Sequence, residues 1–304
     1  MRILHVSDCA GVGAVLAKYQ RQLGHESCVA KFGNWDGRGI DEYYNIKTTF
    51  TPQSSSVYKA AKKGLPRNRS LRRVLFKLWS IYPSLKLYSF VLHELKNYDV
   101  LHIHGSWGIA LFLWRQPHVL EFHGDDVRKS PSMYSWFRKN TTKLFVWGYA
   151  KRNKIYVSTP DLLDDVPNGI WIPNIADTDH FNNSVYKPKK GTALYSKVWY
   201  ETGAHAQKFA EYNDLELTVL DRKNQCWIDF RDFPEYMGKF EYYIDRQAIH
   251  SLSKTALEAL AIGCKVVDYN GKVIENLPSE HLPLTVAKYT IKIYEEKLNR
   301  RKRK

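Results

Sequence analysis

The stretch HSLSKTALEALAIGCKVVDYNG, residues 250–271, decides how the fold of this chain is interpreted. Small and apolar residues run through it at helical spacing, Gly263 ends the run, and residues 265–267 then read as a strand. One acid, Glu258, stands inside the apolar helix. Because glutamate is rarely buried without a partner, the simplest interpretation points Glu258 toward solvent. The alternative, a carboxylate kept inside for a ligand, depends on the rest of the chain.

Short strands and helices alternate through the whole sequence. Residues 2–7 (RILHVS) predict a strand that is followed by a glycine turn, a helix at 14–24 and a second strand at 26–32. Two apolar runs that end in His-Gly, at 98–105 and 117–124, read as buried parallel strands. This β-α-β pattern predicts a parallel, doubly wound α/β fold. Further strands are expected at 154–160, 170–174, 192–198, 215–221, 241–245 and 264–269.

The length of 304 residues suits two domains of ordinary size. A polar stretch with a tandem lysine follows Pro173 and Asn174 and makes a plausible boundary. An amphipathic helix at about 285–300 closes the chain. We therefore expect an N-terminal lobe, a smaller C-terminal lobe and a basic tail, at residues 1–173, 174–290 and 291–304.

Several features of the sequence indicate where in the cell the protein works. The N-terminus reads as a strand rather than a secretory signal, and the longest apolar run, residues 108–114, is too short to span a bilayer. The four cysteines are far apart and form no Cys-x-x-Cys motif, which suits a reducing compartment. We expect a cytoplasmic protein that is attached to a membrane only peripherally.

The net charge of +15 is concentrated in two places. Residues 43–93 contain ten lysines or arginines and no acid, and residues 300–304 are all basic. Without these fifteen residues, 31 basic side chains balance 31 acidic ones. Such segregation indicates a polyanionic partner, either a membrane or a nucleic acid.

Residues 59–79 contain the most informative part of the basic segment. Apolar side chains, with Trp79 among them, fall on one helical face, and arginines and lysines flank that face. A cationic amphipathic helix of this kind suits an anionic bilayer surface, although a core-facing helix with a charged outer side has the same pattern. Since no nucleic-acid-binding module is visible, we expect residues 59–79 to contact an anionic membrane and expect no nucleic acid.

Gly11-x-Gly13 follows the first predicted strand. It lacks the third glycine of a dinucleotide-binding fingerprint, and no acid ends the second strand, so an oxidoreductase is disfavoured. Small residues at this edge of a parallel sheet still let the backbone approach a ligand closely.

Together these motifs resemble those of a known family. Five segments resemble, in order and near spacing, GT-B glycosyltransferases similar to glycosyltransferase family 4: residues 11–27, 101–105, 121–128, 171–181 and 253–267. The resemblance implies two Rossmann-like lobes with an interdomain cleft, the second lobe being shortened here. It also implies transfer of a sugar from a nucleotide-sugar to a lipid-linked or glycan acceptor, with retention and without a metal or other cofactor.

The resemblance assigns a role to the acid in the opening stretch. Glu258 would accept hydrogen bonds from the ribose hydroxyls of the donor, and the helix start at residues 253–255 would face the diphosphate. Free N–H groups and the helix dipole favour an anion at such a position. The donor-binding residues expected in this way are Gly11, Gly13, Lys197, His250, Ser253, Lys254, Thr255 and Glu258.

This chain departs from the family pattern at three donor positions. The family pairs two acids eight residues apart, and the first position here holds His250. Its phosphate-binding Arg and Lys positions fall on Lys197 and Thr202, so one cation survives, without the guanidinium fork. Arg246 and His205 are candidates for compensation. These departures keep open an alternative, a non-catalytic nucleotide- or glycan-binding protein on a degenerate GT-B scaffold.

On the acceptor side, His123 resembles the family's cleft histidine near the acceptor and the reacting sugar. We expect His123 and Asp125 to be the catalytic residues, with Asp125 orienting the histidine. The alternatives are a core histidine at a strand end and, for Asp125 and Asp126, a cap on the helix that opens at Val127.

Two further groups could suggest a metal. His102 and His104 share a strand, where we expect one ring to face inward and the other outward, which disfavours a shared ion. Asp177-x-Asp179 has the form of a metal-diphosphate motif from another glycosyltransferase architecture. It lies in the family-like segment 171–181, so we reject that role and expect no metal site.

Overall fold

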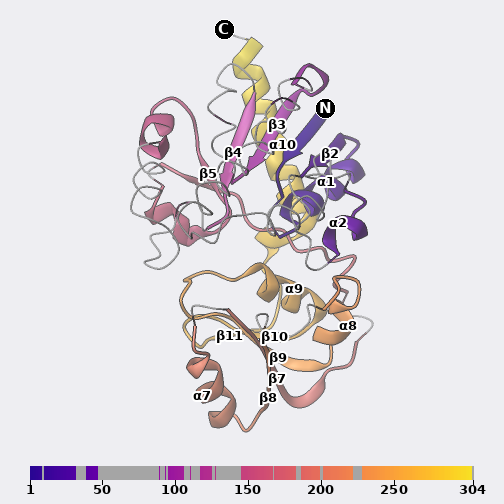
Figure 1. Ribbon diagram of the computed structural model, residues 1–304, viewed down its shortest axis with the longest axis vertical. Helices are drawn as coiled ribbons and strands as arrows, with labels where there is room; N and C mark the ends of the chain where they lie inside the picture. The colour runs from indigo at the N-terminus through magenta and orange to yellow at the C-terminus, as the bar shows by residue number, and fades with distance from the viewer. Residues whose placement is uncertain are drawn as a thin grey trace, which may run out of the picture.

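A computed structural model of the chain contains two α/β lobes, one above the other in Figure 1. The catalytic candidate Asp125 and the expected membrane helix at 59–79 lie outside the residues that the structure describes. Those residues are 1–8, 10–31, 39–46, 95–105, 117–124, 145–166, 168–182, 186–198, 201–221 and 228–302, with 89, 93, 110 and 127.

The first lobe is built around a six-stranded sheet of order β2-β1-β3-β4-β5-β6. Every neighbouring pair is parallel, as the alternating sequence pattern predicts. All residues of β3 and β4 are buried, because the sheet is covered on both faces. The strands are β1 (Arg2–Val6), β2 (Glu26–Ala30), β3 (Val100–His104), β4 (His118–Phe122), β5 (Tyr156–Val157) and β6 (Ile170–Trp171).

The second lobe is smaller and has a five-stranded sheet of order β11-β10-β9-β7-β8. Its strands are parallel except for β11, which pairs antiparallel with β10. The two-lobed α/β architecture with a shortened second lobe is therefore confirmed. The strands are β7 (Lys189–Lys197), β8 (Glu216–Asp221), β9 (Phe240–Ile244), β10 (Lys265–Val267) and β11 (Val273–Ile274).

The helices of the described chain are all short apart from the last. Of these helices, none has the length and apolar character that a membrane span requires. The α-helices that are described along their whole length are α1 (Val12–Gln22), α2 (Ile40–Tyr43), α7 (Ala204–Tyr212), α8 (Phe233–Met237), α9 (Lys254–Ile262) and α10 (Pro283–Lys302). Residues 145–150 are also helical. Three short 3-10 helices lie at Leu95–Asn97, Pro160–Asp164 and Ser279–His281.

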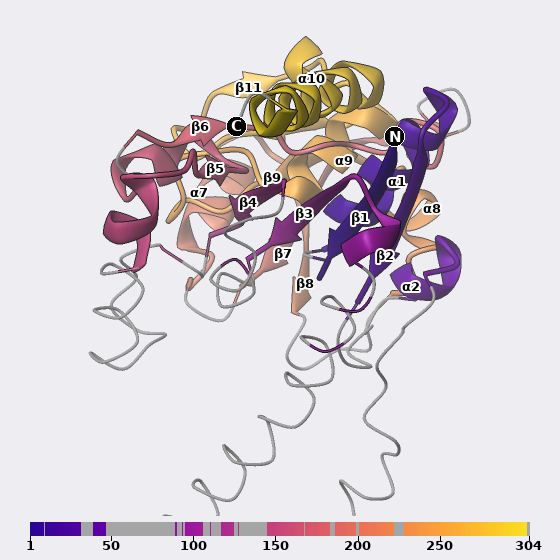
Figure 2. The ribbon, with the colours of Figure 1, turned by 90° about the horizontal axis from the view of Figure 1, so that it is seen from above.

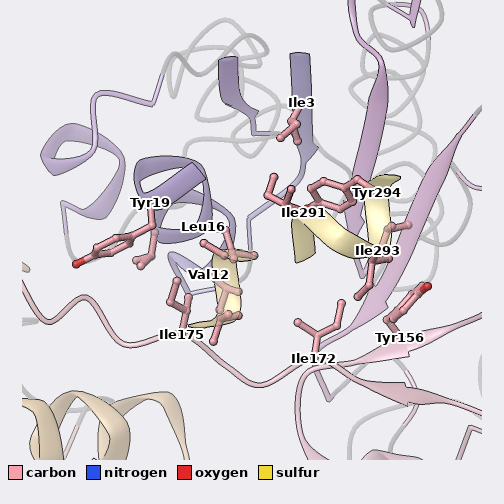
Figure 3. Close-up of a cluster of buried hydrophobic side chains, with 14 of the residues drawn as sticks. Ile3, Val12, Leu16, Tyr19, Tyr156, Ile172, Ile175, Ile291, Ile293 and Tyr294 are labelled. Atoms are coloured by element: carbon pink, nitrogen blue, oxygen red, sulfur yellow. The ribbon is translucent and has the colours of Figure 1, made fainter. Parts of the chain in front are cut away.

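The C-terminal helix α10 returns to the first lobe. It lies beside α1 along one face of the first sheet (Figure 2), and the expected amphipathic helix is confirmed. Ile291 and Tyr294 belong to the same buried cluster as Ile3 and Leu16 (Figure 3). The division at residue 290 thus falls inside one continuous helix that packs on the N-terminal lobe.

Asp177, in the connection between the lobes, is fully buried. Its Oδ1 accepts hydrogen bonds from Nζ of Lys18 at 2.7 Å and the hydroxyl of Tyr19 at 2.8 Å, and its Oδ2 accepts one from Tyr44 at 2.7 Å. Lys18 also pairs with Asp179 at 2.9 Å. Asp177 thus anchors the interlobe connection to the first lobe.

Candidate donor and acceptor site

Each sheet has a point where its strand order reverses. This switch lies between β1 and β3 in the first sheet and between β7 and β9 in the second. Open α/β sheets bind ligands beyond the carboxyl ends of the strands at such points. The segments that follow these strand ends therefore contain the candidate site.

The turn after β1 brings the first lobe close to α9. Gly11 has a left-handed backbone with φ of 79°, and a Cβ placed on it would lie 3.8 Å from Nζ of Lys254 and 3.2 Å from Cγ2 of Ile40. A side chain here would therefore crowd Ile40 of α2 and come into contact with the end of Lys254 from the second lobe. The expected approach of this backbone to a ligand stays a prediction.

The start of α1 is already occupied by a side chain that the sequence did not single out. Asp8 accepts hydrogen bonds from the backbone N–H of Gly11 at 3.0 Å and of Gly13 at 2.7 Å. Burial raises the pKa of Asp8, against the opposing charges of Lys31 and Lys254. The amides of Gly11 and Gly13 are thus satisfied by Asp8. The sequence does contain a signal for this contact, namely an acid between the first strand and the glycine turn.

On the second lobe, Asp245 holds the loop that leads into α9. It follows β9, is buried, and accepts hydrogen bonds from the N–H of Arg246 at 2.9 Å and of Ser253 at 2.8 Å. Ser253 is the N-cap of α9, and its hydroxyl accepts from the N–H of Ala256 at 3.0 Å. Burial raises the pKa of Asp245. The expected helix start at Ser253 is confirmed, and its supporting acid was missed.

Glu258 is buried, with 2% of its surface exposed, so the solvent-facing interpretation is wrong. Its Oε1 lies 2.9 Å from Nζ of Lys254, and its Oε2 has no hydrogen-bond partner among the described residues. An unsatisfied buried acceptor costs roughly 1–3 kcal/mol. Ala256 and Ala259, its neighbours in α9, belong to the same buried cluster as Ile40 of α2 in the first lobe. Glu258 therefore lies where the two lobes meet.

The other donor candidates differ in their exposure and in their contacts. Lys197 ends β7 and has no carboxylate partner among the residues described. Thr255 is half-buried in the first turn of α9. His250 is exposed and stacks on Tyr269, with ring centroids 5.1 Å apart. His205 donates through Nε2 to the carbonyl oxygen of Asp245 at 3.0 Å, so that nitrogen is occupied.

In the first lobe, His123 belongs to a buried cluster of histidines. Its Nε2 lies 2.9 Å from Nδ1 of His104, and Nε2 of His104 lies 2.9 Å from Nδ1 of His5. The rings of His102 and His104 stack at 4.2 Å. The expectation that these two rings face opposite ways is wrong, because residues two apart on a strand share one face.

Glu121 is the acid of this cluster, and the sequence did not indicate it. Its Oε2 lies 2.8 Å from Nε2 of His102, and both side chains are buried. Burial raises the pKa of Glu121 to about 7, with the charge of His123 opposing the shift, and lowers the pKa of His102 to about 3. Between about pH 3 and pH 7 the pair is therefore mainly a carboxylic acid beside a neutral ring.

Two sets of three side chains here place ligand atoms within 4.8 Å of one another: His5, His102 and His104, and His104, Glu121 and His123. In each set, two ring nitrogens are hydrogen-bonded at 2.9 Å. Two ligands of a tetrahedral zinc ion stand about 3.3 Å apart, given bonds of about 2.0–2.1 Å. A shared proton thus fits each nitrogen pair better than a metal ion does.

Two Rossmann-like lobes whose switch-point loops meet at α9 define the GT-B class of fold. The sequence model of Glycosyltransferase Family 4 matches residues 14–179, more than half of the chain, and the chain belongs to this family. The predicted resemblance is therefore confirmed. Among curated proteins, none matches the chain.

Several solved structures are similar to the chain at low identity. The spinosyn rhamnosyltransferase complexed with thymidine diphosphate is 13% identical, with a TM-score of 0.46, and the match covers 89% of this chain and 82% of that one. The sucrose-phosphate synthase from Thermosynechococcus elongatus is 13% identical with a TM-score of 0.47, and the match covers 88% of this chain and 80% of that one. The calicheamicin glycosyltransferase CalG4 is 11% identical with a TM-score of 0.47, and the match covers 99% of this chain and 93% of that one.

Proposed function

We propose that this protein transfers a sugar from a nucleotide-sugar donor to a lipid-linked or glycan acceptor, with retention and without a metal ion. The observation that carries the proposal is the buried carboxylate of Glu258, whose Oε2 has no partner within the described chain although it lies where the lobes meet. A ribose hydroxyl of the donor would satisfy this oxygen. Lys254 balances the charge of Glu258 through Oε1 and leaves Oε2 available.

The donor diphosphate lies in this proposal between the start of α9 and the end of β7. The capped helix start at Ser253 offers backbone N–H groups and the positive end of the helix dipole. Lys197 supplies the cation on the strand side, and Thr255 and His250 complete the donor side. Gly11 lets the first lobe approach the same place without a side chain.

On the acceptor side, His123 contacts the reacting sugar, and Asp125 orients the ring of His123. The acceptor is a lipid-linked or other glycan, and residues 59–79 bring the first lobe to an anionic bilayer at the inner face of the membrane. In this arrangement the enzyme works in the cytoplasm as a peripheral membrane protein.

A non-catalytic binding protein on the same scaffold is the second candidate. It is favoured by His250, which is exposed and stacked on Tyr269 where the family has an acid, and by Thr202 in place of a cation. Such a protein would bind a nucleotide or glycan and transfer nothing.

A thermal-shift screen across nucleotide-sugars and their nucleoside diphosphates tests the shared part of both proposals. A ligand at one hundred times its dissociation constant adds about 2.7 kcal/mol to the stability of the folded state. At least one nucleotide-sugar should raise the melting temperature of the wild type and fail to do so for Glu258→Ala. No shift with any donor would contradict the proposed donor site. Turnover of the donor that binds then separates the enzyme from the binding protein.

A further inference from the structure

Thr290 of α10 begins a chain of hydrogen bonds that ends at His123. Its hydroxyl lies 2.8 Å from the carbonyl oxygen of Ala287 and 3.2 Å from Nε2 of Gln20. A carbonyl oxygen only accepts, so the single hydroxyl proton of Thr290 is donated to Ala287. Toward Gln20, the oxygen of Thr290 must therefore act as an acceptor.

This requirement orients the buried side-chain amide of Gln20. The amide nitrogen faces Thr290, and the amide oxygen faces His5 Nε2 at 2.9 Å and the hydroxyl of Ser27 at 2.7 Å. The reverse orientation would place two acceptors together at Thr290. Because the amide oxygen only accepts, Nε2 of His5 must carry a proton.

The same donor and acceptor rule determines which nitrogen carries the proton in each of the three rings. Burial lowers the pKa of His5 to about 3, lowers that of His104 well below its usual value, and lowers that of His123 against the opposing charge of Glu121. Each neutral ring carries one N–H. With Nε2 of His5 protonated, its Nδ1 accepts from Nε2 of His104 at 2.9 Å. Nδ1 of His104 then accepts from Nε2 of His123 at 2.9 Å.

We infer that this directed chain, Thr290–Gln20–His5–His104, holds His123 as its Nε2–H tautomer, so that Nδ1 is the hydrogen-bond acceptor of the catalytic candidate. The four residues are positioning residues, and they act on His123 from α10, α1, β1 and β3. The consequence for catalysis rests on the proposed function: a fixed Nδ1 acceptor suits a sugar hydroxyl donor. It also gives the return of α10 to the first lobe a functional reason.

The matched variants Thr290→Val and Thr290→Ser test the inference. Valine keeps the shape of threonine and removes the hydroxyl, whereas serine keeps the hydroxyl. Long-range ¹H–¹⁵N correlation spectra of histidine-labelled protein report which ring nitrogen carries the proton, and a His123→Asn sample assigns the His123 signals among the eleven histidines. Thermal unfolding of each variant checks that it is folded.

We expect one Nε2–H form of His123 in the wild type and in Thr290→Ser. In Thr290→Val the hydroxyl of Tyr294, 3.3 Å from Nε2 of Gln20, remains on that side. A hydroxyl can donate or accept, so the amide of Gln20 can then reverse, and a second, Nδ1–H set of signals should appear. A Nδ1–H or doubly protonated His123 in the wild type at neutral pH would overturn the inference, and so would an unchanged tautomer in Thr290→Val. The measurement needs neither donor nor acceptor, so it stands or falls separately from the proposed sugar transfer.

Discussion

Nζ of Lys254 lies 2.9 Å from Oε1 of Glu258, one turn further along α9, and both side chains are largely buried. A surface pair at this spacing is worth only about 0.2–0.5 kcal/mol. Inside the protein the lysine has a larger role, because an unpaired buried carboxylate would be strongly destabilising. The pair explains how an apolar helix keeps an acid at the lobe interface while leaving Oε2 available to a ligand.

Glu258→Ala should weaken binding of the cognate nucleoside diphosphate by about 10- to 100-fold. A hydrogen bond to a charged group is worth about 1.5–3 kcal/mol, and about 1.4 kcal/mol corresponds to a factor of ten. Glu258→Gln, which keeps one oxygen acceptor, should fall between Ala and the wild type. Isothermal titration calorimetry measures all three affinities.

The matched control is Glu235→Ala, because Glu235 lies in α8 of the same lobe and its side chain is 68% exposed. It should leave nucleotide affinity unchanged. Equal affinities for the wild type and Glu258→Ala would remove Glu258 from the donor site, provided that the variant unfolds cooperatively.

Lys197→Ala should weaken binding of a nucleoside diphosphate far more than binding of the nucleoside alone, because the ammonium group is expected to contact the phosphates. Lys190→Ala is the control, since Lys190 is an exposed lysine near the opposite end of the same strand. Competition binding with the two ligands gives the comparison. Equal losses for nucleoside and diphosphate would contradict the assignment.

Asp177→Asn should lower the free energy of unfolding by about 1.5–3 kcal/mol at neutral pH, because Asp177 accepts from the charged Lys18 as well as from two tyrosines. Burial alone would raise its pKa, but the hydrogen bonds from Lys18, Tyr44 and Tyr19 outweigh burial and lower it. The contribution is therefore fully present above the unfolded pKa of about 3.9 and is lost as the pH falls through the lower folded value.

Denaturant unfolding of wild type and Asp177→Asn across acidic pH measures this difference, which should shrink below about pH 4. Asp179→Asn serves as the control, since Asp179 pairs with the same lysine but its side chain is 55% exposed. It should cost less than about 1 kcal/mol. A stability difference for Asp177→Asn that does not change with pH would contradict the role of the ionised carboxylate.

Changing Arg67, Arg69, Arg72 and Arg73 to serine should release the protein from anionic liposomes. Each basic residue near such a surface contributes roughly 1 kcal/mol, and the attraction is screened over about 8 Å at physiological salt. Binding of the wild type should accordingly fall as salt rises. Co-sedimentation with liposomes of phosphatidylserine, compared with phosphatidylcholine alone, measures both effects.

Four exposed lysines of the second lobe provide a control with the same charge change: Lys187, Lys190, Lys208 and Lys272. Their serine variant should bind liposomes nearly as well as the wild type. If the arginine variant also co-sediments like the wild type, or if both variants lose binding equally, residues 59–79 are not the docking surface.

The strands and the order of the lobes could be predicted because buried parallel strands leave short apolar runs in the sequence. The run at 117–124 contains β4, and the run at 264–269 contains β10. The return of α10 could not be predicted in this way. An amphipathic helix indicates that one face is covered, but its sequence does not say which lobe covers it.

The candidate site was predicted unevenly for a similar reason. Ser253 and Glu258 lie within one helix, so a local motif indicates both. The histidine cluster joins His5, His104 and His123 from three strand ends, and His5 and His104 are 99 residues apart. Such contacts follow from the strand order, which the sequence alone leaves open. The shared face of His102 and His104 was predictable, because strand side chains repeat every two residues.

Release of nucleoside diphosphate from a panel of nucleotide-sugars, measured side by side for the wild type and Glu258→Ala, tests the central claim most directly. The assay is run with a mixed lipid-linked and glycan acceptor extract, and with water as the only acceptor. A sugar transferase that uses the α9 donor site should release the diphosphate from at least one donor, faster with acceptor present, and at least about tenfold more slowly after the substitution. Release from no donor, or equal release by both proteins, would contradict the account.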